Sequence, residues 1–284
     1  MKIFISGDME GLPDIFYPPP IENVSDRTLE MEEKLFTHFV SYLANSLHNN
    51  GADEIIVSDS HGKLTNIIFE SMPRYVSLIK GGIRPLDMVY GIDRQIDGAV
   101  FLGFHSASGT MYSNFDHTYD GDTYHKIMVN GQIASEYYLC SLVAGEFNVP
   151  VIMVLGDDKL RDEVSKKTPW AAYVTMKESI GNWAAIYNSL ETIEKRINES
   201  SKKIMDKLSN NEHSEIKPLK IDGRLEFQFE LKRTIYADVA EMIPGVDRLN
   251  GYTLRYFTDK PSSGFKMIQL ISYLSAGAKS YVES

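Results

Sequence analysis

Four short apolar runs in this sequence are each followed by residues that can ligate a metal ion. The runs and their followers are Ile3–Ser6 with Asp8 and Glu10, Ile55–Ser58 with Asp59 and His61, Ala99–Phe104 with His105, and Val151–Leu155 with Asp157 and Asp158. Crowded carboxylates repel one another and need a cation. Histidine nitrogens beside them favour zinc or a related transition ion over calcium or magnesium. The residue types therefore indicate a transition-metal centre.

A cluster of this size can serve two ions rather than one. One carboxylate can bridge two ions roughly 3.5–4 Å apart, and a water held between them becomes a strong nucleophile. Hydrolysis is the chemistry that such a pair performs. A single Asp-x-Glu or a single histidine after a strand is commonly structural, so the prediction rests on the joint pattern.

The elements that must position these residues are readable from the same runs. Each run is almost continuously apolar, as in strands buried on both faces of a parallel sheet, whose carboxyl ends share one edge. Phe36, Phe39, Val40, Leu43 and Leu47 recur at helical spacing between the first two runs. Alternating strands and helices predict an α/β domain with a parallel sheet and helices on both faces.

The remaining chain reads differently. Asn130-Gly131 between short apolar runs predicts a type I′ hairpin over 126–133, followed by a helix from about Ser135 to Glu146. An amphipathic helix over 188–209, an alternating strand over 224–232, a strand over 253–257 and a helix over 265–276 predict an α+β half. We therefore expect a catalytic α/β domain over 1–162 and a smaller α+β domain over 163–284.

Composition excludes several classes of function. The formal net charge of −10 argues against a nucleic-acid partner, whose phosphates need clustered lysines and arginines. The single cysteine, Cys140, permits neither an internal disulfide nor a thiolate zinc site, and its apolar neighbours place it in the core. No apolar run approaches the roughly 20 residues of a membrane span, and the opening MKIFISGDMEG lacks a signal-peptide pattern. A cytoplasmic protein is expected.

The motifs occur in an order that resembles the M55 family of metallopeptidases. They are residues 5–11 (Ile-Ser-Gly-Asp-Met-Glu-Gly), 57–62 (Val-Ser-Asp-Ser-His-Gly), 101–105 (Phe-Leu-Gly-Phe-His), 116–118 (Asp-His-Thr), 129–131 (Val-Asn-Gly), 135–136 (Ser-Glu) and 154–158 (Val-Leu-Gly-Asp-Asp). The resemblance is detailed over residues 1 to about 160. It implies a binuclear zinc-dependent aminopeptidase for short peptides, including peptides with D-amino-acid N-termini. Other divalent transition ions are compatible with the same ligands.

The resemblance also implies a role for each matched residue. Asp8 would bridge two Zn²⁺ ions, Glu10 and His61 would complete one site, and His105 and Glu136 would complete the other. By the same resemblance the metal ligands are Asp8, Glu10, His61, His105 and Glu136, and the catalytic residue is His117. The family forms ring-shaped homodecamers, so the resemblance implies a homo-oligomer.

Two departures from the family pattern concern the surroundings of these residues. The family usually has Ser before the catalytic histidine, and Asp116 in that place could orient the His117 imidazole or raise its pKa. Tyr137 and Tyr138 follow Glu136 where the family has a glycine nearby, and they either reshape the pocket or pack.

Two other functions fit the same ligands. A metal-dependent phosphoesterase would need additional cations, for which Lys63 and Lys80 are candidates, but no phosphate-binding glycine-rich loop is present. A catalytically silent metal-binding protein associated with peptide transport is the second, and it would bind metal without hydrolysing any peptide.

Overall fold

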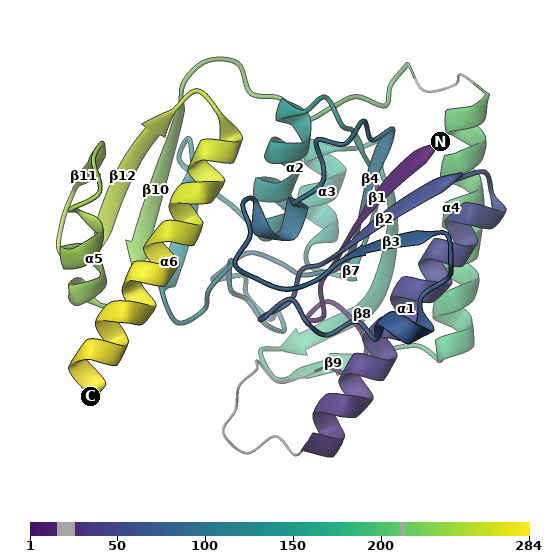
Figure 1. Cartoon of the computed structure of the whole chain (residues 1–284), viewed down its shortest axis with the longest axis horizontal. Coiled ribbons are helices and arrows are strands. Elements are labelled where there is room, and N and C mark those ends of the chain that lie inside the picture. The colour runs from purple at the N-terminus through teal and green to yellow at the C-terminus, as the bar shows by residue number, and fades with distance from the viewer. Residues whose placement is uncertain (16–25, 211–213) are drawn as a thin grey trace.

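The computed structural model describes residues 1–15, 26–210 and 214–284, and it contains two sheets (Figure 1). The larger sheet has seven strands in the order β3-β2-β1-β4-β7-β8-β9. Their bounds are β1 (Lys2–Gly7), β2 (Glu54–Asp59), β3 (Val76–Ile79), β4 (Gly98–Phe104), β7 (Val151–Asp157), β8 (Ala172–Gly181) and β9 (Ala184–Ile186). All neighbours pair in parallel except β9, which is antiparallel to β8. The four apolar runs thus form β1, β2, β4 and β7, as predicted.

Helices cover both faces of this sheet, which confirms the predicted α/β architecture (Figure 1). Helices α1 (Asp26–Asn49) and α4 (Leu190–Ser209) pack on one face, in a core that includes Ile3 and Val57. Helices α2 (Glu136–Glu146) and α3 (Arg161–Lys167) pack on the other, in a core that includes Phe4 and Phe101. Successive residues of a strand point to opposite faces, and the continuous apolar runs supply both cores.

The helix predictions hold where the structure describes the residues. Phe36, Phe39 and Leu47 are fully buried along one side of α1. Ser135 caps α2, because its hydroxyl accepts a hydrogen bond from the Tyr138 amide at 3.1 Å. The sequence also predicts Ser25 as the N-cap of the first helix and 18–20 as a stiff surface loop, and both lie outside the described residues.

The second sheet is antiparallel, with five strands in the order β11-β12-β10-β5-β6. Its strands are β5 (Tyr124–Val129), β6 (Gln132–Ile133), β10 (Leu225–Leu231), β11 (Val246–Arg248) and β12 (Thr253–Thr258). Asn130 and Gly131 have φ of 50° and 75°, as a type I′ turn requires. Helices α5 (Thr234–Ala240) and α6 (Pro261–Glu283) accompany this sheet, and two short 3₁₀ helices, η1 (Phe69–Ser71) and η2 (Asp87–Val89), precede β3 and β4 respectively.

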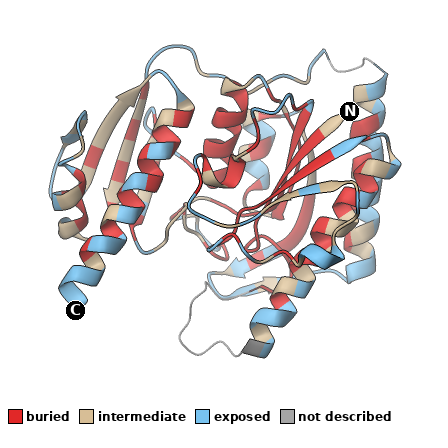
Figure 2. Cartoon of the chain, viewed as in Figure 1, coloured by how far each residue is buried: buried red, intermediate tan, exposed pale blue. Residues whose placement is uncertain are grey.

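The chain passes between the two sheets more than once. Strands β5 and β6 lie before residue 162 but belong to the antiparallel sheet. Strands β8 and β9 lie after residue 162 but belong to the larger sheet, against which α4 packs. Residues of α2 and α6 share one core, and buried residues lie in both sheets and in the helices between them (Figure 2). The division into domains 1–162 and 163–284 remains a prediction from the sequence.

No helix in the described part of the chain is both long enough and apolar enough to cross a membrane. Cys140 is buried in α2, as its apolar neighbours predict.

Candidate metal centre

The ligand candidates meet at the carboxyl edge of the parallel sheet because two loops approach each other closely there. The Asp8 amide donates a hydrogen bond to the Leu102 carbonyl at 2.8 Å, and the Gly11 amide donates to the Gly103 carbonyl at 2.6 Å. A Cβ on Gly103 would lie 2.0 Å from the Asp8 carbonyl oxygen, and one on Gly11 would lie 2.2 Å from the Phe104 carbonyl oxygen. Only glycine permits this approach at either position.

Three side chains form the first group of candidate ligands. Nδ1 of His61 lies 3.0 Å from Oδ1 of Asp8 and 2.6 Å from Oε2 of Glu10. One ligand atom from each residue falls within 4.8 Å of the others. All three side chains are buried. They come from the ends of β1 and β2, which are neighbours in the sheet.

The second group uses Asp8 again, together with His105 after β4 and Glu136 at the start of α2. Nε2 of His105 lies 3.5 Å from Oε1 of Glu136. A third group combines Glu10, His105 and His117 within the same limit of 4.8 Å. The structure therefore brings all five predicted ligands and His117 into one cluster, with Asp8 common to two groups.

Two buried nitrogens test whether the cluster fits a metal. Nε2 of His61 and Nε2 of His105 are buried and have no hydrogen-bond partner among the described residues. His105 lies with Nδ1 3.0 Å from the Ser106 carbonyl, so Nδ1 carries the proton and donates. Its Nε2 lone pair then faces the cluster. An imidazole held by a carbonyl on one side and free on the other is the usual arrangement of a metal ligand.

The charges of the cluster also fit a cation. Burial, with the charge of Glu10 beside it, raises the pKa of Asp8 well above its ordinary value. Burial alone would raise the pKa of Glu10 and Glu136, but His61 and His105 outweigh it and both pKa values are lowered. Burial opposes a charge on the histidines, yet these carboxylates raise the pKa of His61, and that of His105 to about 10. The pKa of each histidine is thus raised by the carboxylates beside it, as expected where buried negative charge attracts a cation.

His117 lies beside the cluster and is partly open to solvent. Its ring centroid is 4.6 Å from that of His105, and its Nε2 is 3.8 Å from a carboxylate oxygen of both Glu10 and Glu136. Burial in the cavity and the charge of His105 lower the pKa of His117 below its ordinary value. A neutral imidazole at the mouth of the cluster can accept a proton near neutral pH.

Asp116 does not play the part considered for it from the sequence. Its two carboxylate oxygens accept hydrogen bonds from the Gly109 amide at 3.0 Å and from Nδ2 of Asn182 at 2.6 Å. The pKa of His117 is lowered rather than raised. Tyr137 is buried in α2 and bonds the Thr168 hydroxyl at 2.7 Å, so it packs rather than shaping the pocket.

Other candidate residues have structural partners. Asp59 accepts hydrogen bonds from the amides of Asn66 and Ile67, and Asp157 accepts them from the amides of Ser106 and Leu160. These two carboxylates fix the loops that carry His61 and His105. His125 is exposed and lies 3.9 Å from Glu230 on the antiparallel sheet.

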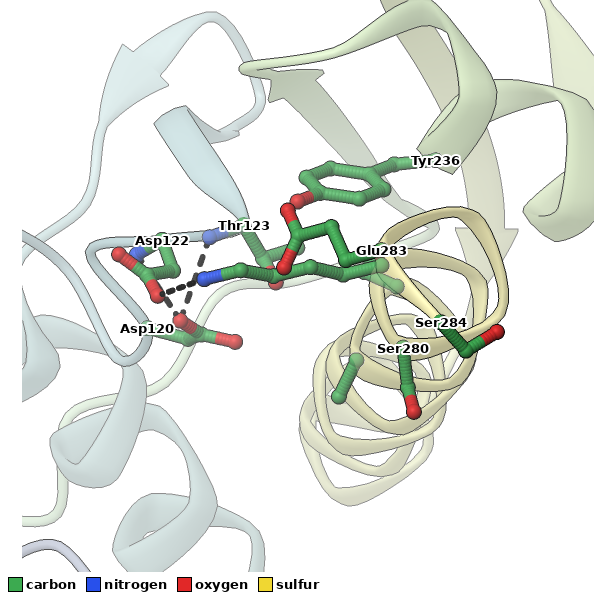
Figure 3. Close-up of a pocket in the computed structure, with 10 residues that line it drawn as sticks. Asp120, Asp122, Thr123, Tyr236, Ser280, Glu283 and Ser284 are labelled. Carbon is green, nitrogen blue, oxygen red and sulfur yellow. Dashed lines mark hydrogen bonds and ion pairs between the residues drawn. The ribbon is translucent and has the colours of Figure 1, made fainter.

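Two cavities open onto the cluster and share Glu10, His61 and His117. One, of about 540 Å³, runs toward α6 and is lined by Lys63, Asp87 and Tyr273 among others. The other, of about 790 Å³, runs toward the β8–β9 turn and includes Trp183. Cavities of this size hold small molecules. Asp120, at their junction, also lines a third pocket, where Lys279 of α6 lies 3.0 Å from Asp122 (Figure 3).

Sequence reasoning missed Tyr119, which follows the Asp-His-Thr motif by one residue. The Tyr119 amide donates to Oε1 of Glu136 at 2.6 Å, and its hydroxyl donates to Asp87 at 2.6 Å. It thus connects the second ligand group to the wall of the cavity. Its φ of 68° is unusual for a tyrosine, and nothing in the sequence signals this conformation.

Comparison with known proteins extends this picture over the whole chain. A sequence model of the peptidase M55 family, described as D-aminopeptidase, matches residues 1–270. A D-aminopeptidase of Bacillus subtilis (strain 168) is 29% identical over 263 residues, which are 92% of each protein. The solved structure of the Zn-dependent D-aminopeptidase DppA from Bacillus subtilis, described as a self-compartmentalizing protease, matches with a TM-score of 0.87 at 26% identity, over 97% of this chain and 98% of that one. The likeness therefore includes both sheets.

Proposed function

The chain belongs to the M55 family of metallopeptidases and is a metal-dependent aminopeptidase, and on this premise we propose that it uses two zinc ions to hydrolyse short peptides. The proposed ligands are Asp8, Glu10, His61, His105 and Glu136, with Asp8 bridging the ions. The observation that carries this proposal is the membership of Asp8 in two ligand groups, each completed by a histidine whose Nε2 has no hydrogen-bond partner in the described chain.

Bound zinc would supply a Lewis acid for the scissile carbonyl and a water of lowered pKa. The residues of this chain supply position and proton handling. Asp157 and Asp59 hold the loops of His105 and His61 through backbone amides. His117 presents Nε2 toward Glu10 and Glu136 and, with its lowered pKa, accepts a proton there and returns it to the leaving amine.

We propose substrates with D-amino-acid N-termini because the matched relatives are described as D-aminopeptidases. The cavity of about 540 Å³ has room for a short peptide but not for a folded chain. The test is elemental analysis of the purified protein, followed by assay of L- and D-alanyl dipeptides and amides with zinc restored. We expect two ions per chain and faster turnover of the D-substrates. Faster turnover of the L-substrates would overturn the chirality, and one ion per chain would overturn the binuclear centre.

The two other functions considered from the sequence are not favoured. Lys80 donates to the Ile67 carbonyl, and Lys63 is the only lysine or arginine among the described residues that line the cavity beside α6. A phosphoesterase site would need more cations than this. The absence of hydrolysis across the peptide panel by fully loaded protein would instead support a silent metal-binding protein.

A homo-oligomer, with the decamer as its expected form, is part of the proposal because DppA is described as self-compartmentalizing. Exposed apolar side chains on the β8–β9 hairpin support it: Ile180, Trp183 and Ile186 are each more than half exposed. Light scattering of the purified chain tests the subunit number, and a monomeric mass would overturn it. A cytoplasmic location is also proposed, and cell fractionation tests it.

A further inference from the structure

The β8–β9 hairpin contacts the loop that carries His117, although the two lie far apart in the sequence. Asn182, in the turn between β8 and β9, donates from Nδ2 to Oδ1 of Asp116 at 2.6 Å. Its carbonyl accepts a hydrogen bond from Nδ2 of Asn114 at 2.6 Å. Asn182 therefore contacts the loop on both sides of Phe115, which lies two residues before His117.

Lys177 of β8 holds the same loop from inside the protein. Its side chain is 1% exposed, and Nζ donates to Oδ1 of Asn114 at 2.5 Å and to the Ile15 carbonyl at 3.0 Å. The ammonium also lies 5.1 Å from the centre of the Phe115 ring. Ile15 lies in the segment that follows Asp8 and Glu10. One buried lysine thus connects the segment after the first ligands to the segment before His117.

Burying an ammonium group costs free energy of folding, so its presence here calls for a reason. Desolvation disfavours the charged form, and it lowers the pKa of Lys177 to about 8. A methionine could fill the same volume without that cost. The partners that Lys177 contacts directly are neutral oxygens of the two loops rather than a carboxylate. The lysine is therefore used to join these loops.

The loop needs such contacts because its backbone is strained. Phe115 and Tyr119, on either side of His117, both have positive φ, at 53° and 68°. Residues other than glycine keep this conformation only when the surrounding structure imposes it. Beyond His117 the loop is held by the Thr118 hydroxyl, which donates to the Ala134 carbonyl, and by the Tyr119 amide, which donates to Glu136. Before His117, Lys177 and Asn182 bond the side chains of Asn114 and Asp116, and the Gly109 amide also donates to Asp116. The Ser113 hydroxyl of the same loop bonds the Ser106 hydroxyl.

We infer that Lys177 and Asn182 are positioning residues that set the His117 imidazole against the metal centre through Asn114 and Asp116. This inference rests on the catalytic role given to His117 in the proposed function. It assigns a task in turnover to the β8–β9 hairpin, which carries no proposed ligand, and it explains why the Asp116 carboxylate bonds Asn182 and Gly109.

The test compares Asn182→Ala and Lys177→Met in the full chain loaded with zinc, using D-alanyl-D-alanine as substrate. Misplacement of a reacting group by about 1 Å can cost on the order of 10²-fold in rate. We expect kcat to fall about 10- to 100-fold in each variant, with KM and metal content close to wild type. Glu178→Gln is the matched control, because Glu178 is an exposed residue of the same strand and should keep wild-type kcat.

A double-mutant cycle separates positioning from general damage. If Asn182 acts through His117, Asn182→Ala should cost almost nothing further in a His117→Ala background, because residues that act as a unit are not additive. A full additional loss of kcat would overturn the inference, as would wild-type kcat in Asn182→Ala. Since Asn182 is exposed, its variant serves even if Lys177→Met does not fold.

The cycle also distinguishes this inference from the proposed function. If wild-type protein turns over no peptide, or if His117→Ala alone keeps wild-type kcat, the proposed function is wrong at His117 and the inference fails with it. If His117→Ala loses turnover and Asn182→Ala does not, the proposed function stands and only the positioning role fails.

Discussion

Replacement of His117 by alanine should abolish most turnover while leaving the metal centre intact. Nε2 of His117 lies 3.8 Å from the nearest carboxylate oxygens of Glu10 and Glu136, which is beyond hydrogen-bond distance. Removing the imidazole therefore does not break a hydrogen bond to either carboxylate. The side chain is 23% exposed, so the variant should fold. The proposed ligands His61 and His105 keep their own contacts with Asp8 and Glu136.

The expected size of the effect follows from the role. A general acid–base group contributes about 10²–10⁴-fold in rate, which corresponds to about 2.7–5.4 kcal/mol of activation free energy. Steady-state kinetics on a D-alanyl dipeptide should show this loss mainly in kcat. Elemental analysis of the same sample should still find the wild-type zinc content. His125→Ala is the control, because His125 is exposed beside Glu230 and should retain substantial activity.

Two results would refute this reasoning. Loss of one zinc ion from His117→Ala would make His117 a ligand, as its place in a group with Glu10 and His105 permits. An unchanged rate would pass proton handling to another group. Asp59 and Asp157 are then the next candidates, although each already accepts hydrogen bonds from backbone amides. A proton-handling role for either would require that its replacement lower the rate while the loops carrying His61 and His105 keep their structure.

Three further predictions concern the metal, the buried lysine and the cavity. Asp8→Ala should lose both ions and His105→Ala mainly one, and equal metal loss in the two variants would argue against Asp8 as the bridge. Because burial lowers the pKa of Lys177 to about 8 in the folded state, the unfolded chain binds its proton up to about pH 10.4. The contribution of Lys177 to the free energy of unfolding should therefore rise between about pH 8 and pH 10.4, and denaturation of Lys177→Met across this range should lack that rise relative to wild type. Ala276→Trp should raise KM for dipeptides several-fold at unchanged zinc content, since Ala276 of α6 lines the cavity beside the metal centre, and an unchanged KM would show that substrate does not enter by that side.

The parallel sheet was predictable where the apolar signal was strong. Strands β1, β2, β4 and β7 are almost entirely buried, so their sequences carry the signal of both cores. Strand β8 escaped prediction because its sequence mixes polar residues with apolar ones, and Lys177 within it is buried for its hydrogen bonds. Local pattern cannot show a lysine that is buried by contacts with residues distant in the sequence.

Asp8, Glu10, His61 and His105 were predictable because they closely follow strands of the parallel sheet, which brings them to one edge. Glu136 lies at the start of α2 and was indicated only by the family resemblance. The residues that surround these ligands could not be predicted from the sequence. Asn182 bonds Asp116 although 66 positions separate them in the sequence. Tyr119 has a positive φ that its neighbours in the sequence do not predict. Asp116 shows the difference most clearly, because its place beside His117 in the sequence suggested a contact that the fold gives to Asn182 instead.

Helix α6 lines the cavity beside the metal centre, yet it begins at Pro261, far beyond Glu136, the last proposed ligand in the sequence. The part of the wall that α6 supplies is therefore encoded apart from the proposed ligands. A lineage can change which peptides it accepts by substitutions in its C-terminal helix, while the reaction chemistry is inherited intact. Substrate preference can thus change while the metal ligands stay the same. Differences in substrate preference among related chains should be sought first in the last helix.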